Sequence, residues 1–261
     1  MNHPPNSDQA GPDEWKPPLQ SWILTEENAV TVEGTGMTTE ETADASAVGS
    51  STKMISDVNF VKVGGAITMV APFLFVGALL SGVDTTANEV FDMAGHLLYL
   101  VVIVTLYQLF RDEGAAIRLA AVMGVVGMLL IVLVDFFKLA RLEMVAQIAA
   151  ADAATAPALE AMKETISVLI GALTAVGNGL AWGIGGGLFS FAILRTDRLP
   201  HWLGWGGLLF AATMLVTPFD VMFSAGSTLE SMVFFLGNMY GRLWLVVLGI
   251  FLIRLDASEV P

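Results

Sequence analysis

The sequence contains no cysteine, and this absence removes several kinds of chemistry at once. Without a thiol the chain cannot form a disulfide, use a thiolate nucleophile or ligate an iron–sulfur cluster. Charged residues are also scarce, at 14% of the 261 residues, whereas about a quarter is usual in soluble domains. Hydrophobic residues reach 55%. This balance indicates a protein that lies in a lipid bilayer.

The few charges are distributed unevenly along the chain. Residues 1–61 carry a net charge of −8 and the rest of the chain −5, within a total of −13. Such an acidic chain is unsuited to docking on nucleic acid or on anionic lipid headgroups. No basic start with an apolar run and a small-residue cleavage site precedes residue 60, so we expect no signal peptide.

The apolar segments predict an all-α, polytopic membrane protein whose core is a bundle of six transmembrane helices. A helix needs about 20 predominantly apolar residues to cross the hydrocarbon core of a bilayer. The predicted spans are about residues 61–81, 91–110, 116–137, 166–194, 202–223 and 232–253.

Three further segments complete the predicted domain organisation. Residues 1–57 are rich in Pro, Ser, Thr and acids, which predicts an extended, acidic, largely irregular N-terminal arm ahead of the bundle at 58–256. Residues 138–165 are alanine-rich and predict an extramembrane helical hairpin interrupted at Pro157. Residues 257–261 form a short C-terminal tail.

Basic residues near the span ends predict the orientation of the bundle. Loops 82–90 and 224–231 contain no Lys or Arg, whereas loops 111–118 and 195–201 each contain two arginines. Basic loops stay on the cytoplasmic side. Both termini are therefore predicted to be cytoplasmic. The 138–165 hairpin is an exception to the rule, because it would lie outside although it carries three basic residues.

Small residues recur at every fourth position through the middle of the predicted fourth span. Positions i and i+4 share a helix face, so this row forms a groove with almost no side chains. Small residues let helix backbones approach closely in lipid, which favours helix packing. A groove left open for a flat cofactor, a pigment or a lipid tail is the alternative. The row comprises Gly171, Ala175, Gly179, Gly183 and Gly187.

The segment from Leu199 to Gly207 reads Leu-Pro-His-Trp-Leu-Gly-Trp-Gly-Gly and opens the predicted fifth span. This Leu-Pro-x-Trp-Leu-Gly-x-x-Gly junction resembles one found in uncharacterised six-helix bacterial integral membrane proteins. The likeness covers about residues 60–255. That family has no assigned activity, so the resemblance implies a fold and a bacterial cytoplasmic (inner) membrane location, and no function.

Polar residues inside the predicted spans are the candidate binding residues, because charge in lipid is costly and marks functional sites. Only eleven residues separate Arg242 from the next arginine, or about 16 Å of helix, so Arg242 must lie within the membrane. Asp220 is expected at a matching depth. We predict an Arg242–Asp220 pair, with Asn238 and His96 nearby and Asn178 bonding between helices. The pair serves either as a clamp between helices or as a pocket for an anionic headgroup or ligand.

Cofactor chemistry is limited by the same residues. No lysine lies inside a predicted span, which argues against a retinal-type Schiff base, and only His96 of the three histidines lies in a span, which argues against bis-histidine haem. Ligation of one pigment or haem by His96 stays open, beside a plain hydrogen bond to another helix. A bound lipid is also open. We find no catalytic motif and no metal-ligand spacing, and we expect no enzyme activity.

An apolar island interrupts the acidic arm between residues 15 and 24. It is either a docking motif for a partner subunit or a segment that folds back on the membrane surface, where tryptophan is stable. Its candidate docking residues are Trp15, Leu19, Trp22, Ile23 and Leu24.

Three functions are therefore weighed from the sequence. The first is a non-catalytic subunit that packs within a larger membrane complex, through other membrane subunits or self-association, and docks a partner with its arm. The second is a small-molecule or lipid transporter or binding protein with a polar pocket in the outer half of the bundle. The third is a pigment- or haem-binding subunit that uses His96.

Overall fold

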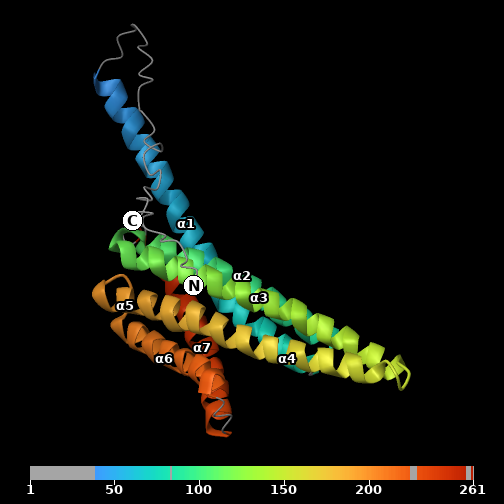
Figure 1. The fold of residues 1–261 in the computed structure, drawn as a ribbon. Helices are drawn as coiled ribbons and strands as arrows, with labels where there is room; N and C mark the ends of the chain where they lie inside the picture. Colours follow the sequence, from blue (N-terminus) through green and yellow to red (C-terminus); the bar gives the residue numbers. More distant parts are fainter. Residues whose placement is uncertain (1–38, 83, 224–227, 257–259, 261) are drawn as a thin grey trace, which may run out of the picture. The chain divides into compact units, whose positions relative to one another are not determined.

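Helices account for the regular structure of the described residues (Figure 1). This computed structural model describes residues 39–82, 84–223, 228–256 and 260, and the side chains of 57–82, 84–216, 232, 233, 235–256 and 260. In chain order the elements are α1 (Thr39–Leu80), α2 (Thr86–Phe110), the 3₁₀ turn η1 (Arg111–Glu113), α3 (Ala115–Ala150), α4 (Ala156–Asn178), the π-helical η2 (Gly179–Gly186), α5 (Gly187–Arg195), α6 (His201–Phe223) and α7 (Thr228–Arg254).

The helices have the length and composition of membrane spans. Five segments are long and apolar enough to cross a bilayer, and α6 adds a shorter apolar stretch, His201–Val216, within the described residues. The five are Asp57–Leu80, Thr86–Glu113, Ala115–Ala150, Ala156–Arg195 and Phe235–Arg254. Large hydrophobic side chains such as Leu80 and Leu243 are exposed on these helices, as expected where lipid replaces water. The chain is an all-helical, polytopic membrane protein with five to six long apolar helices.

The start of α1 differs from the predicted boundary of the arm. The chain divides into two units, Met1–Asp44 and Ala45–Pro261. In the first unit only residues 39–44 are described, and they are helical. Because α1 begins at Thr39, residues 39–57 are helical and not irregular. The reason is local: acidic Glu40 and Glu41 stabilise the N-terminus of a helix, and the alanines after them favour helix.

Helices α3 and α4 lie side by side and extend together beyond α6 and α7 (Figure 1). The turn between them occupies residues 151–155, so Pro157 lies in the first turn of α4. Proline is tolerated there, because the backbone N–H that it lacks would have no partner within the helix. Asp152 holds this turn by accepting the backbone N–H groups of Ala154 at 3.2 Å and Thr155 at 2.8 Å. Hydrogen bonds from the Thr155 side chain and backbone lower the pKa of Asp152.

The apolar core is densest at the end of the bundle where α2 ends and α6 begins. Phe110, Ile193, Leu203 and Leu252 are fully buried there. The indole N–H of Trp244 donates to the carbonyl of Leu203 at 2.9 Å, which ties α7 to the start of α6.

Glycines allow α3 to approach the α4–η2 helix closely. A Cβ added to Gly127 would lie 2.5 Å from the carbonyl oxygen of Gly177, and one added to Gly185 would lie 2.9 Å from the carbonyl oxygen of Ala120. Side-chain atoms do not fit between backbones at these distances. The contact therefore depends on the row that contains Gly177, Ala181 and Gly185.

The predicted row of small residues faces other neighbours. Gly171 has nothing within 4 Å of an added Cβ, whereas a Cβ at Gly183 would lie 2.7 Å from Leu215 and one at Gly187 would lie 3.4 Å from Ala211, both on α6. Ala175 and Gly179, the other members, are buried. The π-helical hydrogen bonds of η2 change the angular step per residue, so an i, i+4 row does not keep to one face through it.

We expect Gly127→Ala to destabilise the bundle, because its Cβ would force α3 away from the backbone of η2. Overpacking of this kind costs about 1–3 kcal/mol. Gly171→Ala is the matched control: open space surrounds the position, and replacing a mid-helix glycine with alanine favours helix by about 0.5–1 kcal/mol. Thermal unfolding of both variants in lipid nanodiscs tests this, and equal midpoints would contradict the close contact.

Candidate functional site

One face of α2 carries a line of polar residues. Glu89, Asp92, His96 and Tyr99 are spaced by three or four positions, which places them on one helix face. The line starts in the first turn, after Thr85 caps the helix by accepting the N–H of Asn88 at 3.1 Å. It therefore leads from the end of the helix toward its middle.

Lys138 of α3 gathers three carboxylates from two helices. Its Nζ lies 3.4 Å from Glu89 Oε2, 3.4 Å from Asp92 Oδ2 and 3.4 Å from Asp135 Oδ1. The carboxylate of Asp135 is completely buried and that of Glu89 nearly so. A buried acid is costly unless it is paired, so these contacts explain how α2 and α3 keep three acids together.

His96 joins the same network through Asp135. The imidazole Nδ1 lies 2.7 Å from Asp135 Oδ2, which leaves Nε2 as the other ring nitrogen. The edge of the ring meets the ring of Phe75 on α1, with centroids 5.1 Å apart. A carboxylate in this position orients the imidazole.

Arg242 of α7 contacts the same Phe75 ring. Its guanidinium carbon is 4.3 Å from the centre of that ring, a cation–π contact, and a side-chain hydrogen bond joins the guanidinium to Tyr99. No carboxylate pairs with Arg242 among the side chains that the structure describes. The positive charge is thus held by a ring and a hydroxyl.

The helix α4–η2 forms the remaining wall. Thr174, Asn178 and Trp182 follow one another at intervals of four, and the Asn178 amide donates to the Thr174 carbonyl at 3.0 Å. The Trp182 ring meets Tyr99 edge-on, with centroids 5.2 Å apart, and continues to Phe210 at 5.6 Å. These aromatic rings separate the polar residues from the apolar end of the bundle.

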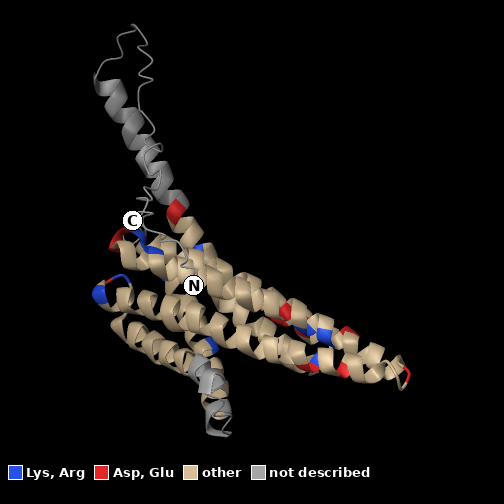
Figure 2. Ribbon diagram, in the orientation of Figure 1, with Lys and Arg blue, Asp and Glu red and all other residues tan. Residues whose placement is uncertain are grey.

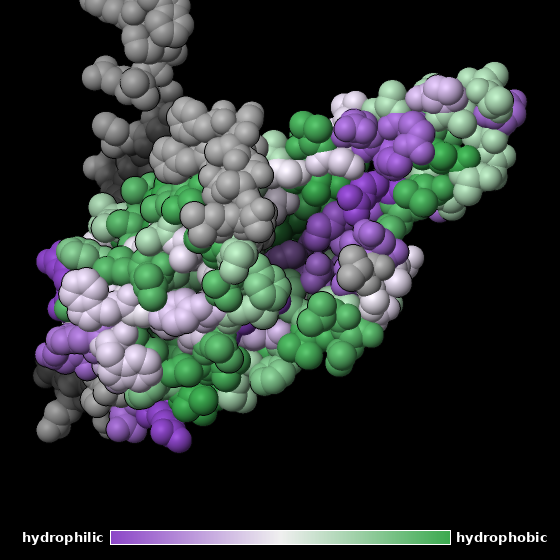
Figure 3. Space-filling model, turned by 90° about the horizontal axis from the view of Figure 1, so that it is seen from below, coloured by the Kyte–Doolittle hydropathy of each residue, from purple (hydrophilic) through white to green (hydrophobic). Residues whose placement is uncertain are grey.

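A cavity of about 300 Å³ opens between these walls. His96, Asn178, Asn238 and Arg242 line both this cavity and an adjoining one of about 30 Å³ beside Trp182. On the face seen in Figure 3, hydrophilic residues gather along a hollow flanked by hydrophobic surface. Figure 2 shows that charged residues otherwise lie mainly at the helix ends and on the extended part of α3 and α4. We use the name polar cavity for the larger space together with His96 and the four charged residues that line it, which are Asp92, Asp135, Lys138 and Arg242.

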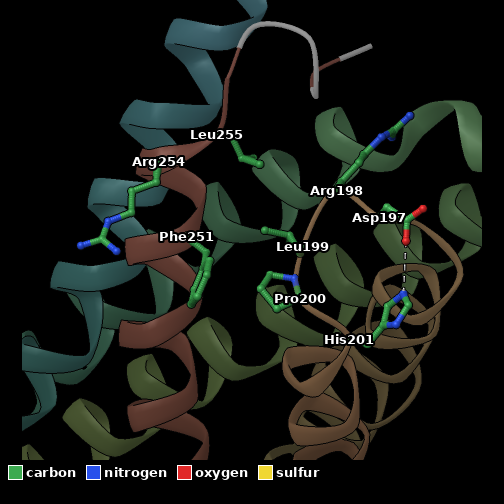
Figure 4. A pocket seen from close by; sticks show the side chains of 8 residues that line it. All are labelled: Asp197, Arg198, Leu199, Pro200, His201, Phe251, Arg254 and Leu255. Carbon is green, nitrogen blue, oxygen red and sulfur yellow. Dashed lines mark ion pairs between the residues drawn. The ribbon is translucent and has the colours of Figure 1, made fainter.

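A second opening lies at the other end of the bundle (Figure 4). It has about 420 Å³ and lies beside Phe251, Arg254 and the residues that precede α6. The side chains of Arg198 and Arg254 point away from each other there. Arg198 is already bound to Asp112 and to the carbonyl of Leu109. This opening does not present converging charges.

The predicted site residues can now be located. Arg242, Asn238, His96 and Asn178 lie around one cavity. The side chain of Asp220 lies outside the described residues, and so do the predicted docking residues Trp15, Leu19, Trp22, Ile23 and Leu24. The predicted Arg242–Asp220 pair and the docking role of the arm stay predictions.

The network around Lys138 was missed by the sequence reasoning. Asp92 and Asp135 lie inside the predicted second and third spans, and an acid inside a span was the signal that could have found them. Lys138 directly follows the predicted third span, although α3 continues to Ala150. The described residues hold no group of three or more His, Asp or Glu suited to a metal ion.

Comparison with known families places the chain. A family model described as a domain of unknown function, DUF4386, matches residues 84–254. The chain belongs to the DUF4386 family. The matched segment runs from just before α2 to the end of α7 and so contains every charged residue of the polar cavity. No curated protein and no solved structure matches the chain.

We expect Asp135→Asn to destabilise the protein strongly, because it removes the partner of His96 and one partner of Lys138. Breaking a buried pair typically costs about 3–5 kcal/mol. His96→Gln should cost less, and the double variant should lose less than the sum of both, since the two residues share one interaction.

The control for this cycle is the exposed pair at the other end of the bundle. His201 and Asp197 lie 3.7 Å apart in solvent, so Asp197→Asn should not change stability measurably. Thermal unfolding in nanodiscs provides the readout. Additive losses at His96 and Asp135 would show that they do not interact.

Proposed function

We propose that the protein is a six-span membrane protein that binds a small organic anion in the polar cavity. The observation that carries this proposal is the position of Arg242. Its guanidinium lies in the cavity wall against Phe75 and Tyr99, and it forms no ion pair with a described carboxylate, although Asp92 of the same cavity interacts with it electrostatically. A cation kept in an apolar bundle at such cost is a functional candidate by default.

The partners of the charged residues around the cavity, and not their sum, favour an anionic ligand over a cationic one. Asp92 and Asp135 already share Lys138, and Asp135 also holds His96. These acids therefore have cationic or hydrogen-bonding partners before any ligand enters. Arg242 has donors to offer, and a carboxylate matches the planar guanidinium in a bidentate way.

The remaining walls define the size and polarity of the ligand. Ile131, Val134, Phe235 and Met239 supply apolar surface, while Asn178, Asn238 and Thr174 supply amide and hydroxyl groups. A volume of about 300 Å³ is at the small end of ligand pockets. A compact carboxylate with an apolar body fits this description better than a tetrapyrrole pigment or haem.

The cavity supports one of the functions weighed from the sequence over the others. A subunit that only packs in a complex needs no polar space among its helices, and a clamp between two helices needs no cavity. The binding or transport role uses the cavity directly. The assembly role through the arm is not supported by any described residue, and we do not place it first.

Benzoate is a suitable probe, because it pairs a carboxylate with an apolar ring. We expect the full-length protein in nanodiscs to bind benzoate, to reject neutral benzamide, and to lose at least tenfold in affinity on Arg242→Gln, because the charge that attracts the carboxylate is gone. Isothermal titration calorimetry measures this.

Arg254→Gln is the matched control, since Arg254 lies on the same helix but is exposed and faces a different opening. It should bind benzoate as the wild type does. Equal affinity in Arg242→Gln and wild type would refute the proposal. Stability lost in Arg242→Gln and regained on adding Asp220→Asn would favour the clamp.

The orientation of the protein is part of the same proposal. Arg111, Arg118, Arg195, Arg198 and Arg254 cluster at one end of the bundle, as expected on the cytoplasmic side of a bacterial inner membrane. With six spans both termini are then cytoplasmic. The α3–α4 turn and the open side of the polar cavity face outward.

The absence of cysteine makes this orientation easy to test. Single cysteines at Ala153 in the α3–α4 turn and at Asp197 before α6 are both at exposed positions and have no background thiol. A membrane-impermeant maleimide added to intact spheroplasts should label Ala153→Cys, and Asp197→Cys only after the membrane is opened. The reverse pattern would invert the topology.

A further inference from the structure

We infer that the polar cavity binds a proton together with the anion, and that the His96–Asp135 pair is the proton site. This inference rests on the proposed function, because it concerns the ligand of the same cavity. Its starting point is the 2.7 Å contact between the imidazole and a carboxylate that is completely buried.

The charges that surround His96 favour an added proton. They are Glu89, Asp92 and the Tyr99 hydroxyl on α2, Asp135 and Lys138 on α3, and Arg242 on α7. With His96 neutral, the three carboxylates exceed the two cations by one. Glu89 Oε2 has no hydrogen-bond partner among the described residues, and its nearest cation is the shared Lys138 at 3.4 Å. A proton on His96 would offset this excess, and the position of Arg242 bears on when that proton binds.

Arg242 supplies the reason why proton and anion bind together. The ring of Phe75 contacts both His96, at 5.1 Å between centroids, and the guanidinium of Arg242, at 4.3 Å. A protonated His96 therefore lies near a second cation that contacts the same ring and lines the same cavity, and the two repel each other while the cavity is empty. A carboxylate bound beside Arg242 removes this repulsion. Each ligand then raises the affinity for the other, as thermodynamic linkage requires.

The consequence is that the cavity takes up a neutral combination of one anion and one proton. Anion affinity should therefore fall as the pH rises, by up to about tenfold per pH unit for one linked proton. Coupling of this kind is what a proton-coupled anion carrier needs from its binding site. His96 takes part in both the pair and the cavity: its Nδ1 meets Asp135, and its imidazole is part of the cavity wall.

The test counts protons taken up per benzoate bound. Calorimetry of the full-length protein in nanodiscs, in Tris and in HEPES at one pH, separates proton uptake from binding because the two buffers differ in ionisation enthalpy. We expect uptake approaching one proton in the wild type and in the control His201→Gln, which removes the exposed histidine of the Asp197 pair. His96→Gln should still bind benzoate, but with no proton uptake and a flat pH dependence.

The outcomes separate the two proposals. Benzoate binding without proton uptake in the wild type would overturn the inference and leave the proposed function standing. No binding at any pH would overturn both. Uptake that persists in His96→Gln would place the proton elsewhere and overturn the inference.

A second measurement needs no variant of the cavity. The chain has three histidines, so imidazole NMR signals can be assigned with His3→Gln and His201→Gln. At fixed pH, benzoate should move the signals of His96 toward those of the protonated ring. Unchanged His96 signals on benzoate binding would overturn the inference, even if His96→Gln did not fold.

Discussion

The ammonium of Lys138 lies at the same distance from three carboxylates, and the polar half of the bundle depends on this contact. An acid in an apolar helix is tolerated only when a partner compensates for its lost hydration. One lysine does this for Glu89 and Asp92 on α2 and for Asp135 on its own helix. With the acids held in this way, His96 can be oriented by Asp135, and Arg242 is left to face the cavity rather than a fixed partner.

Close backbone contact makes this arrangement rigid. Gly127 and Gly177 allow α3 and the α4–η2 helix to approach until no side chain fits between them. The aromatic rings of Tyr99, Trp182 and Phe210 lie between the polar residues and the apolar core. The bundle is therefore divided along its axis. Toward one end buried apolar side chains form the core between the helices, and toward the other ionised groups surround a cavity among the same helices.

Sequence reasoning could locate the helices because length and apolar composition decide whether a segment can cross a bilayer. It could not find the π-helical turns at 179–186, since a shift in backbone hydrogen bonding leaves no mark in composition. At the site, Arg242 and His96 were found because each is a polar residue deep in an apolar segment. Asp135 and Lys138 were missed because they lie at the edge of the predicted third span, where charges are common. Because α3 continues to Ala150, these two residues lie well within the helix and not at its end.

The order of the helices along the chain has a consequence for biogenesis. The three acids and the lysine that contact one another lie on α2 and α3, which are neighbours in the chain and are synthesised before α4 begins. Membrane helices insert first and associate afterwards, so a two-helix unit can bring its own acids and lysine together without waiting for the remaining spans. Arg242 arrives last, on α7, and has to be accepted by a site that already exists. Its contacts with Phe75 and Tyr99 can therefore form only after the last span has been made.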